Sequence, residues 1–144
     1  MWAWGTIMRF EGRIERDGRF WLAEIPAFDA VTQGRTKREA LKRVEDMLET
    51  MAGSIDFRVM AFSMGGDTFE IEANHIGTLV ALLLQRQRKQ QGLTLSDAAE
   101  RLGQRSPNAY ARYEQGSAMP SVEKLEQLLW ALNPDQRIVW RLAE

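Results

Sequence analysis

The chain has 144 residues, of which 27% are charged and 44% belong to the hydrophobic set, an ordinary balance for a globular protein. Its formal net charge is −1, so no overall positive charge drives binding to nucleic acid. The absence of cysteine excludes disulfides, and a single histidine leaves too few ligands for a typical zinc site. We therefore expect a protein without metal or cofactor. The longest apolar run, residues 79–84, is too short to span a bilayer, and the start of the chain lacks the pattern of a signal peptide, so we expect a cytoplasmic protein.

Residues 7–33 are predicted to form three strands. Apolar side chains alternate from Met8 to Ile14, and Asp17-Gly18 is a typical hairpin turn. The return strand covers residues 20–25, and a third, short strand covers residues 30–33.

A helix and two further strands are predicted to follow. The helix starts at the capping box Thr36 to Glu39 and ends by Gly53. A strand is expected over residues 55–61, and residues 69–73 alternate with glutamates as an edge strand. This order predicts an α+β unit in which one amphipathic helix packs on a small sheet.

Residues 92–116 predict two short helices joined by a tight turn. Thr94 is expected to cap the first helix, and Gly103 to end it. Ser106 is expected to cap the second helix, with Pro107 at its first position. Such a pair of helices can place the second one in the major groove of DNA.

Residues 84–132 resemble the Cro/Xre-type helix-turn-helix family. The matching positions are Leu84, Arg88, Gly92-Leu93-Thr94, Ala99, Leu102-Gly103, Tyr110, Arg112, Glu114, Gly116, Pro120-Ser121, Leu125, Leu128 and Ala131-Leu132. The family usually has glutamine where this chain has Leu95, and the turn at residues 103–106 is one residue longer than usual. The resemblance implies an all-α, five-helix domain that binds double-stranded operator DNA as a homodimer or higher homo-oligomer.

The candidate DNA contacts lie in the turn and at the start of the second helix. Arg105, Asn108 and Arg112 are the candidate readers, because asparagine can pair with adenine and arginine with guanine or a phosphate. The alternative is that these three side chains are solvated surface residues without a binding role. The complete set is Thr94, Gln104, Arg105, Ser106, Pro107, Asn108, Ala109 and Arg112.

Other residues in this region receive structural interpretations. We expect an ion pair between Arg88 and Glu114, and core packing for Tyr110 and Tyr113. Three further basic residues are expected to be solvated, with one of them in contact with a phosphate at most: Arg86, Lys89 and Arg101.

Residues 8–64 resemble the HicB antitoxin domain. The resemblance rests on Gly18 to Pro26, Ala30 to Gly34, Thr36, and Glu39-Ala40-Leu41. It implies a partial RNase-H-like fold, a small HicA-type toxin that cuts messenger RNA as the protein partner, and repression of the protein's own operon.

We therefore predict a HicB-like toxin-binding domain over residues 1–73, a linker over 74–78 and a helix-turn-helix domain over 79–144. The leading hypothesis is a bifunctional antitoxin of a type II toxin-antitoxin system, without enzymatic activity. One alternative is an Xre-family transcriptional regulator with an N-terminal ligand-sensing domain. The other is a metal-dependent nuclease using Glu24, Asp29 and Asp46, which is disfavoured because their spacing gives no sign that they converge.

The two ends of the chain and the linker carry further expectations. Trp2 and Trp4 have no obvious partner, and Met8 is expected to be the natural initiator. His75 is expected to be an exposed linker residue. The apolar residues of 138–142 are expected to cap the helical core, with a dimer contact as the alternative.

Overall fold

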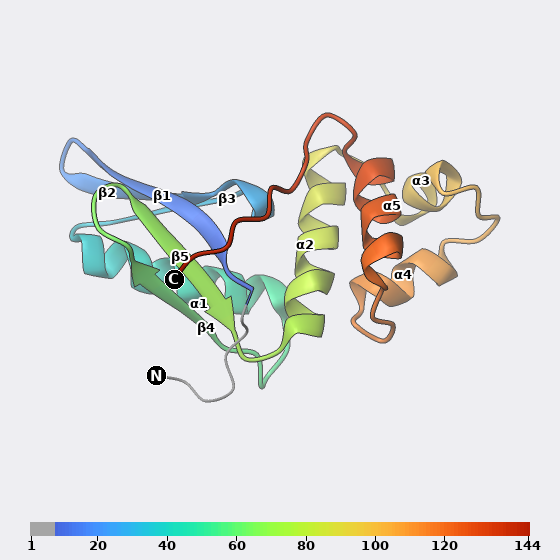
Figure 1. Ribbon diagram of the computed structural model, residues 1–144, viewed down its shortest axis with the longest axis horizontal. Coiled ribbons are helices and arrows are strands. Elements are labelled where there is room, and N and C mark those ends of the chain that lie inside the picture. The colour runs from blue at the N-terminus through green and yellow to red at the C-terminus, as the bar shows by residue number, and fades with distance from the viewer. Residues whose placement is uncertain (1–7) are drawn as a thin grey trace.

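A computed structural model describes residues 8–144, which form a sheet with one helix on one side of the molecule and the remaining helices on the other (Figure 1). The expectations for Trp2 and Trp4 lie outside the described residues. In chain order the elements are β1 (Phe10–Asp17), β2 (Phe20–Ile25), the 3-10 turn η1 (Pro26–Phe28), β3 (Ala30–Gly34), α1 (Lys37–Ala52), β4 (Val59–Ser63), β5 (Thr68–Ala73), α2 (Ile76–Gln90), α3 (Leu95–Arg101), α4 (Asn108–Glu114) and α5 (Val122–Leu132).

The sheet is antiparallel throughout, with the strand order β3-β2-β1-β5-β4. The predicted order of three strands, one helix and two strands is confirmed. The prediction that residues 69–73 form an edge strand is wrong, because β5 pairs with both β1 and β4. The alternation of Glu70 and Glu72 suggested a solvated face, but the Arg9 guanidinium pairs with both side chains. Its Nη1 atom lies 3.3 Å from Oε1 of Glu70, and its Nη2 atom lies 3.0 Å from Oε1 of Glu72.

Helix α1 covers one face of the sheet. The Thr36 hydroxyl accepts the Glu39 amide at 3.0 Å, as the predicted capping box requires. The Glu39 carboxylate accepts the Arg35 amide instead of that of Thr36. The apolar side of α1 packs into the main core, whose largest members include Phe28, Phe57 and Phe69.

The strand predicted over residues 55–61 begins later than expected, at Val59. Ile55 is 88% exposed, and the Phe57 amide donates to the Ser54 carbonyl in a turn. The apolar alternation that predicted the strand therefore begins in a turn, before the strand itself. Phe57 still enters the core, from the segment before β4.

Strand β4 lies at one border of the sheet, and two carboxylates of α1 bind its outward amides. Glu49 accepts the Val59 amide at 2.8 Å, and Glu45 accepts the Ala61 amide at 2.9 Å. Backbone donors that would otherwise be unpaired at this border are satisfied by the helix.

Helix α2 belongs to both parts of the molecule and lies between them in Figure 1. Leu79, Leu82 and Leu83 are members of the sheet core, whereas Val80 and Leu84 are members of the helical core. The predicted linker of residues 74–78 is accordingly too long, because residues 76–78 are the first turn of α2. His75 is exposed, as expected, and also caps this helix: its Nδ1 atom accepts the Thr78 amide at 3.1 Å.

The prediction of five helices after the linker is wrong, since the described residues contain four there, α2 to α5. Residues 133–144 form no helix and run back from α5 across the sheet (Figure 1). Ile138, Val139, Trp140 and Leu142 are exposed, so they do not cap the helical core as expected. Within residues 8–144, no helix combines the length and apolar character needed to cross a membrane.

The shared helix makes a prediction about truncation. A chain ending at Ala73 should fail to unfold cooperatively in urea, whereas a chain ending at Gly92 should do so. The shorter chain lacks three core leucines, whose burial contributes roughly 4.5–9 kcal/mol, comparable to the whole stability of a small domain. Circular dichroism during urea titration is the measurement, and a cooperative transition of the shorter chain would contradict the shared core.

Candidate nucleic-acid interface

Helix α3 begins with a complete capping box. The Thr94 hydroxyl accepts the Asp97 amide at 3.0 Å, and the Asp97 carboxylate accepts the Thr94 amide at 2.9 Å. The hydrogen bond from the Thr94 backbone holds the pKa of the Asp97 carboxyl below its ordinary value. Gly103, with a φ of 73°, follows the end of the helix as predicted.

The segment between α3 and α4 presents the start of α4 to solvent. The Ser106 hydroxyl accepts the Asn108 amide at 3.2 Å, but α4 begins one residue later than predicted, so that Pro107 and not Ser106 holds the cap position. Pro107 has a φ of −69° and a ψ of −12°, which is helical geometry. The local signals at residues 106–107 thus set the direction in which α4 leaves the turn.

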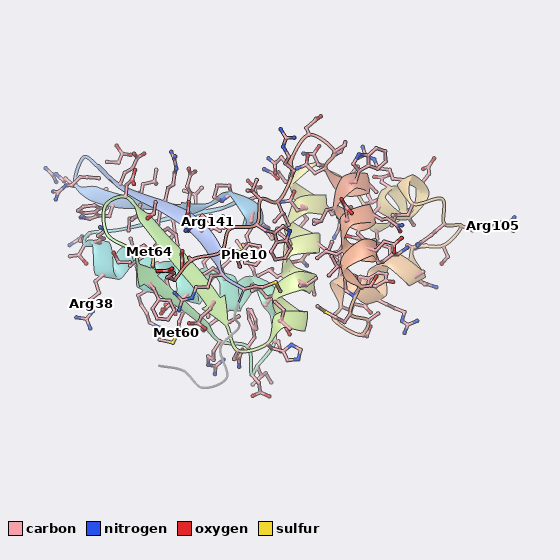
Figure 2. All side chains as sticks on the ribbon, viewed as in Figure 1. Phe10, Arg38, Met60, Met64, Arg105 and Arg141 are labelled. Atoms are coloured by element: carbon pink, nitrogen blue, oxygen red, sulfur yellow. The ribbon has the colours of Figure 1, made fainter. Side chains whose placement is uncertain are left out.

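Most of the predicted DNA contacts lie on the surface. Thr94, Arg105, Ser106, Asn108, Ala109 and Arg112 are exposed. Figure 2 shows Arg105 at the end of the molecule away from the sheet. Within residues 8–144, neither Arg105 nor Arg112 forms an ion pair, so both guanidinium groups are available to phosphates or bases.

Two of the predicted contacts are less accessible. Pro107 and Gln104 are half-buried. The Oε1 atom of Gln104 is out of contact with solvent and has no hydrogen-bond partner in the described part of the chain. With its Oε1 atom shielded, Gln104 has only its Nε2 group to offer as a donor to DNA.

A buried ion pair fixes α4 against α2. The Arg88 guanidinium donates to both carboxylate oxygens of Glu114, at 2.6 and 3.0 Å, and to the Leu93 carbonyl at 2.7 Å. The two side chains are 11% and 6% exposed, so the predicted ion pair is present and largely shielded from water. Hydrogen bonding to Glu114 holds the pKa of Arg88 above its ordinary value.

Tyr110 is fully buried beside this ion pair, and Tyr113 packs against the same core, as predicted. The Tyr110 hydroxyl lies near Glu114 without a hydrogen bond of good geometry. Burial raises the pKa of the Tyr110 hydroxyl, and the negative charge of Glu114 raises it further, so the phenol stays neutral.

Two arginines expected to be solvated also bind backbone carbonyls, and of the two Arg101 is exposed as expected whereas Arg86 is half-buried. Arg86 donates to the carbonyls of Phe28 and Asp29 at 2.9 and 3.1 Å, which ties α2 to the end of η1. Arg101 donates to the Ala131 carbonyl at 3.1 Å, near the end of α5. Sequence spacing carries no signal for either contact, because the acceptors are backbone atoms 30 or more residues away along the chain.

The buried Asn133 side chain, which sequence reasoning missed, joins the end of α5 to α2. Its Nδ2 group donates to Gln87 at 3.0 Å, and Gln87 donates to the Ala27 carbonyl at 2.7 Å. This chain of amides connects three elements: α5, α2 and η1. The orientation of the helical part relative to the sheet is therefore fixed by specific polar contacts as well as by apolar packing.

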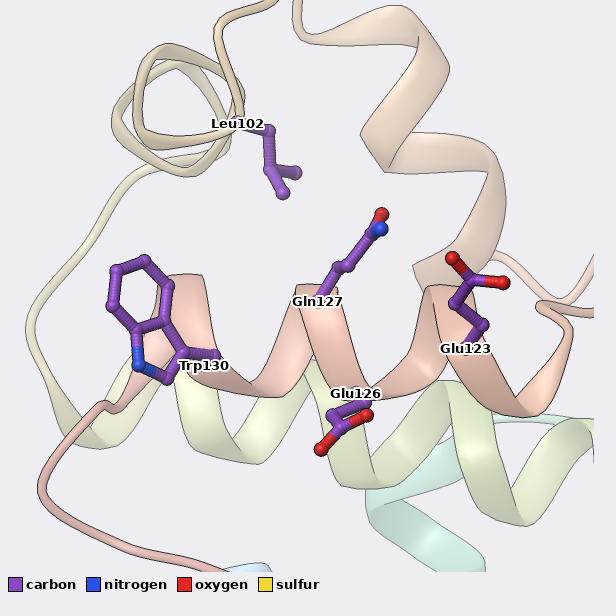
Figure 3. A pocket seen from close by; sticks show the side chains of 5 residues that line it. All are labelled: Leu102, Glu123, Glu126, Gln127 and Trp130. Carbon is purple, nitrogen blue, oxygen red and sulfur yellow. The ribbon is translucent and has the colours of Figure 1, made fainter.

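A shallow groove lies along α5 (Figure 3). Leu102, at the end of α3, faces Gln127 and Trp130 across it, and Glu123 and Glu126 complete its lining. Trp130 is 71% exposed. The two carboxylates would repel phosphates, so this groove is unsuited to the DNA backbone.

The carboxylates considered for a nuclease lie on different elements. Glu24 is on the sheet face opposite α1, and Asp29 follows η1 in an exposed loop. Asp46 is on α1 and pairs with Lys42 at 3.1 Å. Among the described residues, no three His, Asp or Glu side chains are grouped so that they could hold a metal ion.

Comparison with known families identifies the helical part. Residues 84–134 match the family described as helix-turn-helix, which covers about a third of the chain. No curated protein sequence matches the chain. Residues 84–134 thus form a helix-turn-helix domain, and this domain indicates a DNA-binding transcription regulator. The match starts inside α2, at the first residue of the helix after the three leucines of the sheet core.

The buried ion pair can be tested by removing one partner. Glu114→Ala should lower the free energy of unfolding by about 3–5 kcal/mol, because it leaves the Arg88 guanidinium shielded from water without its carboxylate. Asp46→Ala, which breaks the exposed pair with Lys42, is the control and should cost at most about 1 kcal/mol. Urea titration measures both, and equal losses would refute the shielded role of Glu114.

Proposed function

We propose that this protein is an antitoxin that also represses its own operon. In this proposal the sheet with α1 and α2 binds a small HicA-type toxin that cuts messenger RNA, and the helix-turn-helix domain binds operator DNA as a homodimer or higher homo-oligomer. The helix-turn-helix match carries the DNA-binding part. The toxin-binding part, with its implied RNase-H-like relation, rests on the resemblance of residues 8–64 to HicB antitoxins.

The exposed start of α4 supports the choice of DNA-reading residues. Arg105, Asn108 and Arg112 are exposed, and the opposite side of α4 is fixed by the buried Tyr110 and the Glu114 ion pair. In helix-turn-helix proteins the first turns of the second helix meet base edges, while phosphate contacts set its position.

The packing of the sheet core favours a protein partner over the alternative of a small sensed ligand. Phe28, Phe57 and Phe69 fill the space between α1, α2 and the sheet, with exposures of 0–1%. A ligand-sensing domain of the usual kind needs a concave, largely apolar pocket. The outer surface of the sheet, by contrast, carries apolar side chains in the open, including Val31 and Met60.

The DNA-reading assignment predicts distinct effects of single substitutions. Arg112→Ala should weaken binding to the operator upstream of the gene, and Asn108→Ala should relax specificity at one base position by about 1–3 kcal/mol. Arg38→Ala removes the same charge from an exposed residue at the other end of the molecule (Figure 2) and should leave binding unchanged. Footprinting and salt-dependent affinity are the measurements. An unchanged footprint after Arg105, Asn108 and Arg112 are all replaced by alanine would refute the assignment.

The two activities should separate in the full-length protein. The same triple alanine variant should still rescue cells that express the toxin from the neighbouring reading frame, while it fails to repress a reporter under the operator. Copurification of toxin with the variant provides the direct control for binding. Loss of rescue by a variant that unfolds like the wild type would contradict a separate toxin-binding surface.

A further inference from the structure

The face of the sheet opposite α1, called here the open face, carries more acidic than basic side chains, with Arg13 of β1 between Glu11 and Glu15. Five glutamates project from it: Glu11, Glu15, Glu24, Glu70 and Glu72. Glu11 on β1 is directly opposite Glu70 on β5, so two like charges meet across the strands. Glu70 and Glu72 are buried in spite of their charge, and a buried carboxylate requires a cationic partner.

Arginine side chains supply these partners. Arg9 pairs with Glu70 and Glu72, and its guanidinium lies 4.4 Å from the centre of the Phe62 ring. Arg141 comes from the other end of the chain and lies over the sheet in Figure 2. Its Nη2 atom lies 3.2 Å from Glu11 and 3.3 Å from Glu70, so one arginine bridges the opposed glutamates and offsets one of their two charges.

The segment that carries Arg141, residues 136–144, is held loosely. Val139 and Leu142 are 81% and 103% exposed, so apolar burial contributes little to its position. The Arg141 side chain is itself 62% exposed, and ion pairs of this kind are weak. The contact of Arg141 with Glu11 and Glu70 thus depends on opposite charges and is weak.

We propose that the open face is a docking surface for an extended, arginine-bearing segment of a partner protein, with residues 136–144 occupying it until that partner binds. The opposed glutamates recognise the cationic side chain, and the exposed apolar side chains of Val31 on β3 and Met60 on β4 supply the remaining contact. The inference does not depend on the antitoxin proposal, because any partner with such a segment would fit.

A fluorescent peptide with the sequence of residues 136–144 tests the surface. We expect it to bind a chain ending at Asp135 at least tenfold more tightly than the full chain, in which the attached segment competes. A peptide with Gln at the position of Arg141 should bind about two- to fivefold more weakly, as expected for exposed ion pairs. Glu11→Gln in the shortened chain should weaken binding similarly, whereas Glu15→Gln, a glutamate on the same face that does not contact Arg141, should not.

Three results would overturn the proposal. The first is equal binding of the two peptides, and the second is equal binding of the peptide to the shortened and full chains. The third is a full-length dimer in sedimentation that Arg141→Gln converts to monomer, because the occupant of the open face would then be a second copy of this chain. The full-length Arg141→Gln variant also serves where truncation disturbs folding. The amide resonances of residues 138–142 should sharpen in this variant, and unchanged resonances would equally refute the role of Arg141.

Discussion

The structure depends on α2 being apolar on two sides. Leu79, Leu82 and Leu83 complete the sheet core, and Val80 and Leu84, from the same stretch of the helix, belong to the helical core. A rigid helix cannot move one of these sets without the other. The Arg88–Glu114 ion pair and the Asn133–Gln87–Ala27 hydrogen bonds then fix the neighbouring elements to it. The surface proposed to read DNA is consequently positioned by the same element that closes the sheet domain.

Local signals in the sequence predicted the elements and much of the site. The Thr36 and Thr94 caps, the Asp17-Gly18 turn, and the glycine that ends α3 each act within a few residues, and each is present in the structure. The ion pair and the buried Tyr110 were predicted through the resemblance of a densely patterned motif. The assignment of individual side chains to bases or phosphates stays a prediction.

The errors arose where distant parts of the chain decide the outcome. Glu70 and Glu72 have the alternation of a solvated strand face, and only Arg9 and Arg141, more than 60 residues away, make them buried. Residues 79–84 were predicted to belong to the helix-turn-helix domain alone, since periodicity does not reveal that two cores share this segment. The apolar residues near the end of the chain suggested a cap, yet they lie exposed beside the sheet. In each case the partner is set by tertiary packing.

The carboxylates of Glu45 and Glu49 have a consequence for self-association. Exposed strand borders invite pairing with strands of other molecules, which leads to polymers and fibrils. At β4 the amides of Val59 and Ala61 already have acceptors, and an incoming backbone would have to displace two charged groups held by a folded helix. The sheet cannot be extended past β4 while α1 is in place. The helix that covers the core thus also prevents strand-by-strand polymerisation at β4. This protection lasts for as long as the sheet domain stays folded.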